Sequence, residues 1–189
     1  MPIFHEDEIE EDALLYAARL MAAGARTAPK TRGVDRIKTS ILTGEEKDRI
    51  AEAMERKIDQ KENPLPAFKR DAENLRKSPA VLLVGVSREP KKPENPLNCG
   101  ACGYGSCAEF LGAEEREGED FVGPICLFES IDLGIALGSA VKIASELNVD
   151  NRIMYTIGAA AKTMNLLDSD VIIGIPLSVT GKNIYFDRK

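Results

Sequence analysis

Apolar side chains recur every three or four positions near the start of the chain. Within residues 8–24 they are Ile9, Ala13, Leu14, Ala17, Leu20 and Met21. This spacing predicts an amphipathic helix, which acidic residues in the first turn would favour through the helix dipole. Gly24 is a candidate stop for this helix. The segment from Ala25 to Gly33, punctuated by Pro29, then predicts an ordered basic loop.

Further apolar patterns predict three strands and four helices. The strands cover residues 37–42, 80–86 and 171–177, and the helices cover residues 45–58, 67–77, 128–147 and 152–166. Ala80-Val-Leu-Leu-Val-Gly-Val86 is apolar throughout, which is typical of a strand buried on both faces. Thr43-Gly-Glu-Glu46 matches a capping box at the start of the helix over 45–58. Strands that alternate with helices indicate an α/β fold, layered as an α+β sandwich.

Residues 88–98 combine three prolines with charged side chains and predict an exposed linker. This linker is the clearest boundary in the chain. At 189 residues the chain is long enough to bury its own core, so we expect one domain over residues 1–189. We expect an inserted metal-binding segment over residues 95–127, called the cysteine module below.

The cysteine module holds all four cysteines of the chain, spaced Cys99-x2-Cys102-x4-Cys107 and followed by Cys126 after eighteen intervening residues. Four convergent thiolates can hold either a [4Fe-4S] cluster or a tetrahedral zinc ion. Structural zinc sites usually take one Cys-x-x-Cys pair from each side, whereas three neighbouring ligands and a distant fourth suit a cubane. A [4Fe-4S] site is therefore our first interpretation, with zinc and a dithiol redox site as alternatives.

Glycines separate the three clustered cysteines at positions 100, 103 and 105. Glycine permits positive φ, so backbone amides could turn toward the sulfurs and hydrogen-bond them. Ser106 is a candidate cap for a helix that begins at Cys107. Four apolar residues would either shield the cluster or pack in the ordinary way: Phe110, Leu111, Ile125 and Leu127.

Charge and composition exclude several functions. The net charge of −6 argues against nucleic acid, because binding to phosphates relies on a basic surface. The acidic N-terminal segment lacks the basic and apolar start of a signal peptide, and the longest apolar run, 131–147, contains three charges and is too short to span a membrane. We therefore expect a cytoplasmic protein with no membrane partner, whose thiols stay reduced.

Two other features have simple structural explanations. Gly134 and Gly138 lie four residues apart in a predicted helix and indicate close helix packing. The acidic run from Glu114 to Asp120 indicates a solvated or partner-facing surface.

The segment Cys99-Gly-Ala-Cys102-Gly-Tyr-Gly-Ser-Cys107-Ala-Glu-Phe110 resembles the small iron-sulfur domain of corrinoid iron-sulfur proteins and of a ferredoxin-like subunit of electron-transport complexes. In this resemblance Cys126 supplies the fourth ligand. Over its whole length the chain is similar to a family of prokaryotic ferredoxin-domain-containing proteins. The shared segments are 25–29, 32–35, 71–74, 131–134, 148–152 and 180–183.

The flanking segments resemble the flavin-dependent nitroreductase fold. This likeness rests on four segments: Ala25-Arg-Thr-Ala-Pro29, the strand that follows it, residues 78–84 and the helix over 132–147. It implies a homodimer with FMN at the interface. The family's Arg-Arg-Ser phosphate clamp would fall on the acidic segment 5–10, and its Ser-x-x-Asn-x-Gln stretch on residues 30–35, which lack those side chains. The candidate replacement cations for a flavin phosphate are Arg26, Lys30, Arg32 and Lys182.

These observations predict an iron-sulfur protein with a nitroreductase-like core, which transfers electrons to a redox partner protein or a small-molecule acceptor. The single histidine, His5, lies in the acidic N-terminal segment and cannot orient a Ser or Cys nucleophile, so no hydrolytic site is indicated. Two alternatives remain: a flavin-dependent oxidoreductase that uses the cluster as a relay, and a zinc-stabilised interaction module. Whether the protein is an enzyme stays open at this point.

Overall fold

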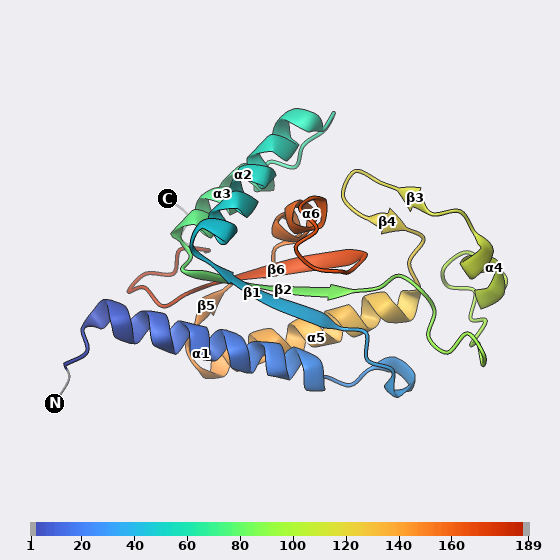
Figure 1. Ribbon diagram of the computed structural model, residues 1–189, viewed down its shortest axis with the longest axis horizontal. Helices are drawn as coiled ribbons and strands as arrows, with labels where there is room; N and C mark the ends of the chain where they lie inside the picture. The colour runs from blue at the N-terminus through green and yellow to red at the C-terminus, as the bar shows by residue number, and fades with distance from the viewer. Residues whose placement is uncertain (1–2, 187–189) are drawn as a thin grey trace.

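The computed structural model describes residues 3–186 and is built around a four-stranded antiparallel sheet in the order β1-β2-β6-β5 (Figure 1). The strands are β1 (Lys38–Thr43), β2 (Ala80–Val86), β6 (Val171–Ser178) and the short β5 (Asp150–Asn151). β2 pairs with β1 on one side through residues 80–85, and with β6 on the other side along its whole length. This central position explains the uniformly apolar sequence of β2, because every one of its residues is buried.

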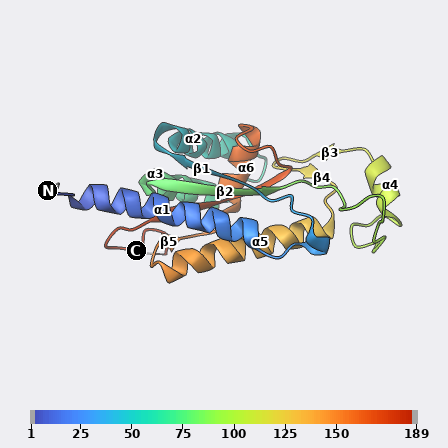
Figure 2. The same cartoon turned by 60° about the horizontal axis from the view of Figure 1, so that its bottom comes forward.

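Alternate residues of β2 face two separate hydrophobic cores, as the period of two in a strand requires. Leu82 and Val84 belong to one core, whereas Val81 and Leu83 belong to the other. Helices therefore cover both faces of the sheet and form a three-layered sandwich (Figure 2). The predicted α/β class with a layered α+β architecture is confirmed.

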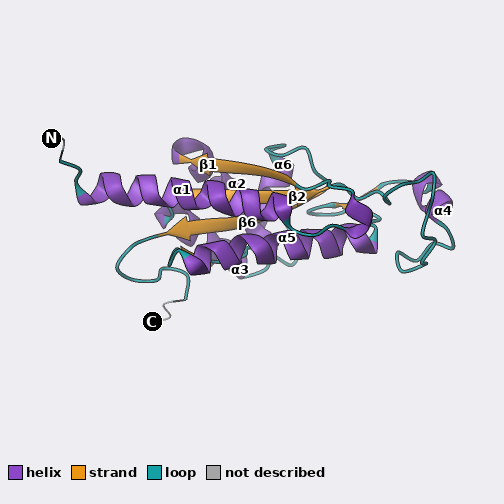
Figure 3. Ribbon diagram, turned by 90° about the horizontal axis from the view of Figure 1, so that it is seen from below, coloured by secondary structure: helices purple, strands orange, loops and turns teal. Residues whose placement is uncertain are grey.

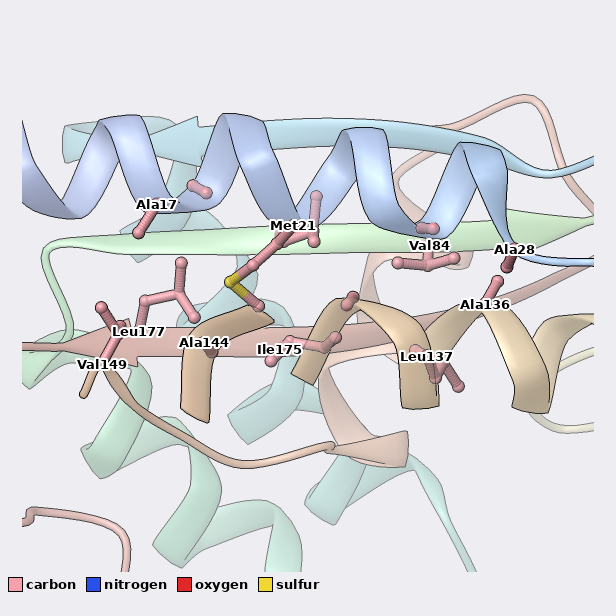
Figure 4. Packing of buried hydrophobic residues seen from close by; sticks show 14 of the residues in the cluster. Ala17, Met21, Ala28, Val84, Ala136, Leu137, Ala144, Val149, Ile175 and Leu177 are labelled. Atoms are coloured by element: carbon pink, nitrogen blue, oxygen red, sulfur yellow. The ribbon is translucent and has the colours of Figure 1, made fainter. Parts of the chain in front are cut away.

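The first face is covered by two long helices, α1 (Glu6–Thr27) and α5 (Leu127–Glu146), which lie side by side (Figure 3). Small residues of the two helices, together with Met21, fill the space against β2 and β6 (Figure 4). Among them, Ala17, Ala136 and Ala144 are at most 2% exposed. Alanine at these positions lets the helices approach the sheet closely.

The second face is covered by α2 (Gly44–Gln60), α3 (Ala67–Lys77) and α6 (Tyr155–Thr163). α6 packs so tightly on β6 that a Cβ atom at Gly158 would lie 1.7 Å from the carbonyl oxygen of Ile172. Only glycine fits there, because the contact is with backbone rather than with a movable side chain.

The cysteine module projects from one end of the sheet (Figure 1). It contains α4 (Cys107–Gly112) and a small hairpin of β3 (Arg116–Glu117) and β4 (Val122–Gly123). The hairpin is attached to α2 and α6 by Asp120, whose carboxylate accepts hydrogen bonds from Lys57 at 3.0 Å and from Lys61 and Tyr155. The expectation that the acidic run from Glu114 to Asp120 forms a solvated or partner-facing surface was therefore wrong for Asp120.

The predicted elements agree with the structure in kind and differ at some ends. The helix over 67–77 and the strand over 80–86 are confirmed at both bounds. Gly24 does not end α1, which continues to Thr27 because the amide of Ala28 still donates to the carbonyl of Gly24 at 3.0 Å. Thr43 directly precedes α2 but makes no side-chain capping bond, so the predicted capping box is not formed. A 3-10 turn (Thr31–Gly33) forms within the predicted basic loop.

The predicted linker over 88–98 is exposed in its second half and mostly buried in its first. Arg88, Pro90 and Lys91 are buried, since they pack between the end of the sheet and the module. Within residues 3–186, no helix combines the length and the apolar character needed to cross a membrane.

Candidate functional site

The four cysteines come from three different local structures. Cys99 and Cys102 lie on the exposed loop, Cys107 is the first residue of α4, and Cys126 immediately precedes α5. Cys126 is 8% exposed, and its amide donates to the carbonyl oxygen of Arg88 at 2.8 Å. Cys126, near the C-terminal end of the module, is thus fixed to the core.

Three of these cysteines, Cys99, Cys107 and Cys126, line one small cavity of about 20 Å³. Cys102 lies close enough to Cys126 to affect it electrostatically. Burial raises the pKa of the Cys126 thiol, against hydrogen bonds from the amides of Phe128 and Glu129 that favour the thiolate. In residues 3–186, no group of three or more Cys, His, Asp or Glu side chains converges closely enough to hold a metal ion.

Two cations line the same cavity, Arg32 and Lys91. Positive charge favours thiolate over thiol and favours a site of net negative charge. Sulfur donors and neighbouring cations therefore fit an iron-sulfur or zinc group in chemical type, although the cavity is too small to hold a cubane without movement of the exposed loop.

The loop glycines adopt the backbone that the sequence predicted. Gly100 has φ of 73° and Gly103 has φ of 89°, a region that side chains disfavour. Their expected role toward sulfur is not seen, because nearby amides donate to oxygen atoms. The amide of Gly103 donates to the carbonyl of Gly100, that of Gly105 to Glu109 and that of Cys107 to Asn98.

The capping role of Ser106 is confirmed, since its hydroxyl accepts from the amide of Glu109 at 3.1 Å. Of the four candidate shielding residues, Phe110 is fully buried and stacks edge-on with Tyr104. Leu111 and Leu127 are each 41% exposed and do not provide a closed apolar cover.

A buried ion cluster, formed by Arg36, Lys91, Glu129 and Asp132, lies behind the cysteine cavity. Lys91 pairs with Asp132 and lies 3.7 Å from Glu129, and each of these three side chains is at most 2% exposed. Asp132 also accepts from the amide and the hydroxyl of Thr31, at 3.0 and 2.9 Å. These contacts attach the linker that leads into the module to α5 and to the Thr31 loop.

Glu129 is the least satisfied member of this buried ion cluster. Burial raises its pKa to about 7, although the positive charges of Lys91 and Arg36 act to lower it. Within the described residues its two carboxylate oxygens have no hydrogen-bond partner. This buried ion cluster was not predicted from the sequence. The local indication was a pair of acids, Glu129 and Asp132, at helical spacing in a largely apolar helix.

Of the four candidate cations for a flavin phosphate, Arg26 and Lys30 lie together against Asp35, whereas Lys182 lies at the other end of the sheet. Arg26 pairs with Asp35 at 2.8 Å, and Lys30 donates to carbonyl oxygens at the end of α1, including that of Ala28 at 2.7 Å. Arg32 donates to the carbonyl of Asn95. Lys182 follows β6, which ends beside the start of β2, because Leu177 pairs with Ala80. Arg26 lies at the opposite end of the sheet, where its guanidinium donates to the carbonyl of Ile37, just before β1.

The N-terminus of α1 does not fit a phosphate either. Its first turn carries Glu6, Asp7 and Glu8, whose charges repel an anion that the helix dipole would otherwise attract. The residues present thus do not form the phosphate clamp that a flavin would need.

Comparisons with known proteins agree with these features. Residues 122–188 match the family model described as "Uncharacterized protein containing a ferredoxin domain (DUF2148)", a segment that includes Cys126 but not the other three cysteines. A protein of Archaeoglobus fulgidus, described as uncharacterized, is 48% identical over 186 residues, covering 98% of this chain and 97% of its own length.

Solved structures show the same fold at low sequence identity. A BluB-like flavoprotein from Clostridium difficile 630 has a TM-score of 0.57 and 13% identity, covering 92% of this chain and 84% of its own. An FMN and NADPH-dependent nitroreductase from sphigopyxis sp. strain HMH has a TM-score of 0.54 and 13% identity, with coverage of 92% and 82%. An NADPH:FMN oxidoreductase from Vibrio harveyi has a TM-score of 0.53 and 10% identity, covering all of this chain and 65% of its own.

These likenesses concern the whole core, not the module alone. The core has the nitroreductase fold, and the chain belongs to the family of uncharacterised proteins that contain a ferredoxin domain.

Proposed function

We propose that Cys99, Cys102, Cys107 and Cys126 bind one [4Fe-4S] cluster and that the protein transfers electrons through it. The observation that carries this proposal is the placement of the cysteines: the distant Cys126 shares one cavity with Cys99 and Cys107. Membership of a family with a ferredoxin domain supports it as well. The electron acceptor is either a partner protein or a small molecule.

A bound cluster would supply one-electron oxidation and reduction. The chain's own residues contribute position and charge. Cys126 is fixed by its amide bond to Arg88, Lys91 and Arg32 add positive charge to the cavity, and the buried pairing of Lys91 with Asp132 holds the wall behind it. Because Cys99 is exposed, its loop is free of core packing and can adjust around the group.

The test is anaerobic purification followed by analysis of iron, sulfide and zinc, with a visible absorption spectrum. We expect about four iron atoms and four sulfides for each chain. Cys126→Ala should lose most of this iron, whereas Ser130→Ala, an exposed change in the same turn of α5, should keep it. One zinc ion with no iron in the native protein would contradict the proposal and favour the interaction module.

A flavin-dependent oxidoreductase is the second candidate, since solved structures of this fold are described as FMN-dependent enzymes. Three observations count against it: Arg26 and Lys30 already pair with Asp35, Lys182 lies at the other end of the sheet, and the start of α1 is acidic. The test is to denature the same preparation and to measure the amount of flavin that is released. We expect less than a tenth of an equivalent, and stoichiometric FMN would overturn that expectation.

We also propose a homodimer through the outer face of α5. Leu127, Ile131 and Ile135 are each 38–41% exposed at intervals of one helical turn. A Cβ atom at Gly134 or Gly138 would meet nothing within 4 Å, so the expected close packing of these glycines is not made within the described chain. Sedimentation of Ile131→Lys against the native protein tests this, with a monomer expected for the variant and a dimer for the native chain.

A further inference from the structure

Arg88 lies just after the end of β2, where the chain leaves the sheet for the cysteine module. Its backbone amide donates to the carboxylate of Asp170, directly before β6, at 2.8 Å. Its carbonyl accepts from the amide of Cys126 at 2.8 Å, and the residue is only 6% exposed. The Arg88 backbone is therefore fixed between the core and one of the four candidate ligands.

The side chain of Arg88 contacts the two elements that follow Cys107. Its guanidinium lies 5.8 Å from the centre of the Phe110 ring, in α4, and pairs with Glu115, between α4 and β3. Phe110 is fully buried and lies one turn after Cys107 on the same helix. Arg88 thus contacts Cys126 through its backbone and the helix of Cys107 through its side chain.

The stack that begins at this guanidinium continues from Phe110 into the cysteine loop. The ring of Tyr104, just before α4, lies edge-on to Phe110 with the two ring centres 5.7 Å apart. The amide of Cys107 donates to the side chain of Asn98 at 2.9 Å, and Asn98 is the neighbour of Cys99. The loop before α4 is therefore held at two points, although Cys99 itself is exposed.

Stability alone does not explain a buried arginine at this position. Within the described residues the Nη1 atom of Arg88 has no hydrogen-bond partner, and the side chain of Glu115 is 64% exposed. An ion pair with so exposed a partner contributes little to stability, and an apolar side chain would cost less to bury. The contribution of Arg88 therefore lies in the positions that it fixes.

We propose that Arg88 is the positioning residue of the cysteine site and sets the placement of Cys107 relative to Cys126 before any group binds. This inference rests on the proposed cluster and extends it to a residue that supplies no thiol. Arg88 acts through its protein contacts alone, in the way that outer-shell partners orient metal ligands. With two ligands already placed, binding has to order only the loop of Cys99 and Cys102, which lowers its entropic cost.

The test compares Arg88→Met with the native protein, both purified anaerobically. Methionine leaves the backbone bonds in place and can still pack against Phe110, but it cannot pair with Glu115. Release of iron to an excess of chelator should be about tenfold faster or more, the range typical of outer-shell partners. Arg116→Met removes the same charge from an exposed position in β3, so it is the control and should match the native rate.

Glu115→Gln separates the ion pair from a general loss of stability. It removes the other partner, so it should also speed the release of iron, and the double variant should release iron no faster than Arg88→Met alone. Arg88→Lys keeps the charge but not the flat guanidinium, and it should recover part of the native rate. Additive effects, or no recovery in Arg88→Lys, would contradict the positioning role.

Hydrogen exchange of the apo-protein gives a second readout, which needs no cluster. In Arg88→Met the amides of residues 107–117 should exchange faster, while those of β2 stay protected. Loss of protection across β2 would show a general structural role and overturn the inference. Should Arg88→Met fail to fold, Glu115→Gln decides by the same two measurements.

The two proposals fail in different ways. Native iron release and native exchange in Arg88→Met would overturn the positioning role and leave the cluster in place. A native protein without iron would overturn the proposed cluster. Hydrogen exchange would then decide by itself whether Arg88 holds α4 and the hairpin in position.

Discussion

The sheet with its helices and the cysteine module are stabilised in different ways. The core buries whole strands and helix faces. β2 is fully buried, with one hydrophobic core on each side of it. The module fully buries Phe110 and, at its junction with the core, leaves Cys126 8% exposed. The rest of the module consists mainly of glycines, charged residues and exposed loop. Apolar burial therefore explains the fold of the core, whereas the module depends on caps, ion pairs and whatever its thiols bind.

This contrast shows why a short segment can carry the chemistry of a larger domain. A loop with little apolar surface cannot hold a fixed geometry alone, since ordering it costs conformational entropy. Here the core provides Cys126, Arg88 and the buried ion cluster as fixed points. The rest of the module is then free to adapt to a ligand.

Gly158→Ala should produce the largest effect, because it attacks the core where backbone meets backbone. The new Cβ would overlap the carbonyl of Ile172, and we expect a loss of about 3 kcal/mol or more in the free energy of unfolding. Urea denaturation followed by circular dichroism measures it. Gly181→Ala, in open space after β6, is the control and should be neutral or slightly stabilising. Equal stability of the two variants would contradict the tight contact.

Lys91→Met tests the junction between the two regions. Removal of the ammonium leaves Asp132 and Glu129 as buried acids without their shared cation, which should cost roughly 3–5 kcal/mol. Lys92→Met is the control, since the Lys92 side chain makes no ion pair within the described residues. Thermal denaturation compares them, and an unchanged midpoint for Lys91→Met would show that the buried ion cluster contributes nothing.

Asp120→Asn tests the attachment of the hairpin to the core, which we expect to depend on pH. Burial acts to raise the pKa of Asp120, but hydrogen bonds from Lys61, Tyr155 and Lys57 outweigh it and hold the pKa below its usual 3.8. A depressed pKa in the folded state means that this attachment is present above pH 3.8 and is lost as pH falls through the folded value. The hairpin should therefore open in acid before the core does.

Hydrogen exchange of residues 113–123 between about pH 5 and pH 2 follows this opening, after correction for intrinsic exchange rates. We expect Asp120→Asn to expose the hairpin already at neutral pH, at a cost of about 1.5–3 kcal/mol in local opening. Glu117→Gln, an exposed change in the same hairpin, serves as control. Identical exchange in the native protein and in Asp120→Asn would show that the carboxylate does not hold the hairpin.

Ser106→Ala should give the smallest effect, confined to the module. It removes the cap of α4, worth about 1 kcal/mol, and leaves the core unchanged. Exchange of the amides in 107–112 should rise while those of β2 stay protected. A fall in core stability of the same size would show that the module and the core unfold together.

Much of the core was predictable from local patterns. The uniformly apolar run of β2 and the helix over 67–77 were predicted at both bounds, because strand and helix periodicities are read from neighbours in the chain. The four cysteines of the module and the cap at Ser106 were also predictable, because residue type and spacing alone indicate them. Helix ends were less predictable, since Gly24 was expected to stop α1 and did not.

The sequence by itself determined the layered α/β class, the four candidate ligands and the glycines that turn between them. Only the tertiary structure decided which charges are buried and which polar groups lack partners. Lys91 meets Asp132 across 41 residues of chain, and Thr31 meets it across 101. The physical reason is that burial of a charge depends on partners supplied by distant segments, which no local pattern specifies. The same reason placed Lys182 at the other end of the sheet from Arg26 and Lys30, which the sequence had suggested for the same phosphate.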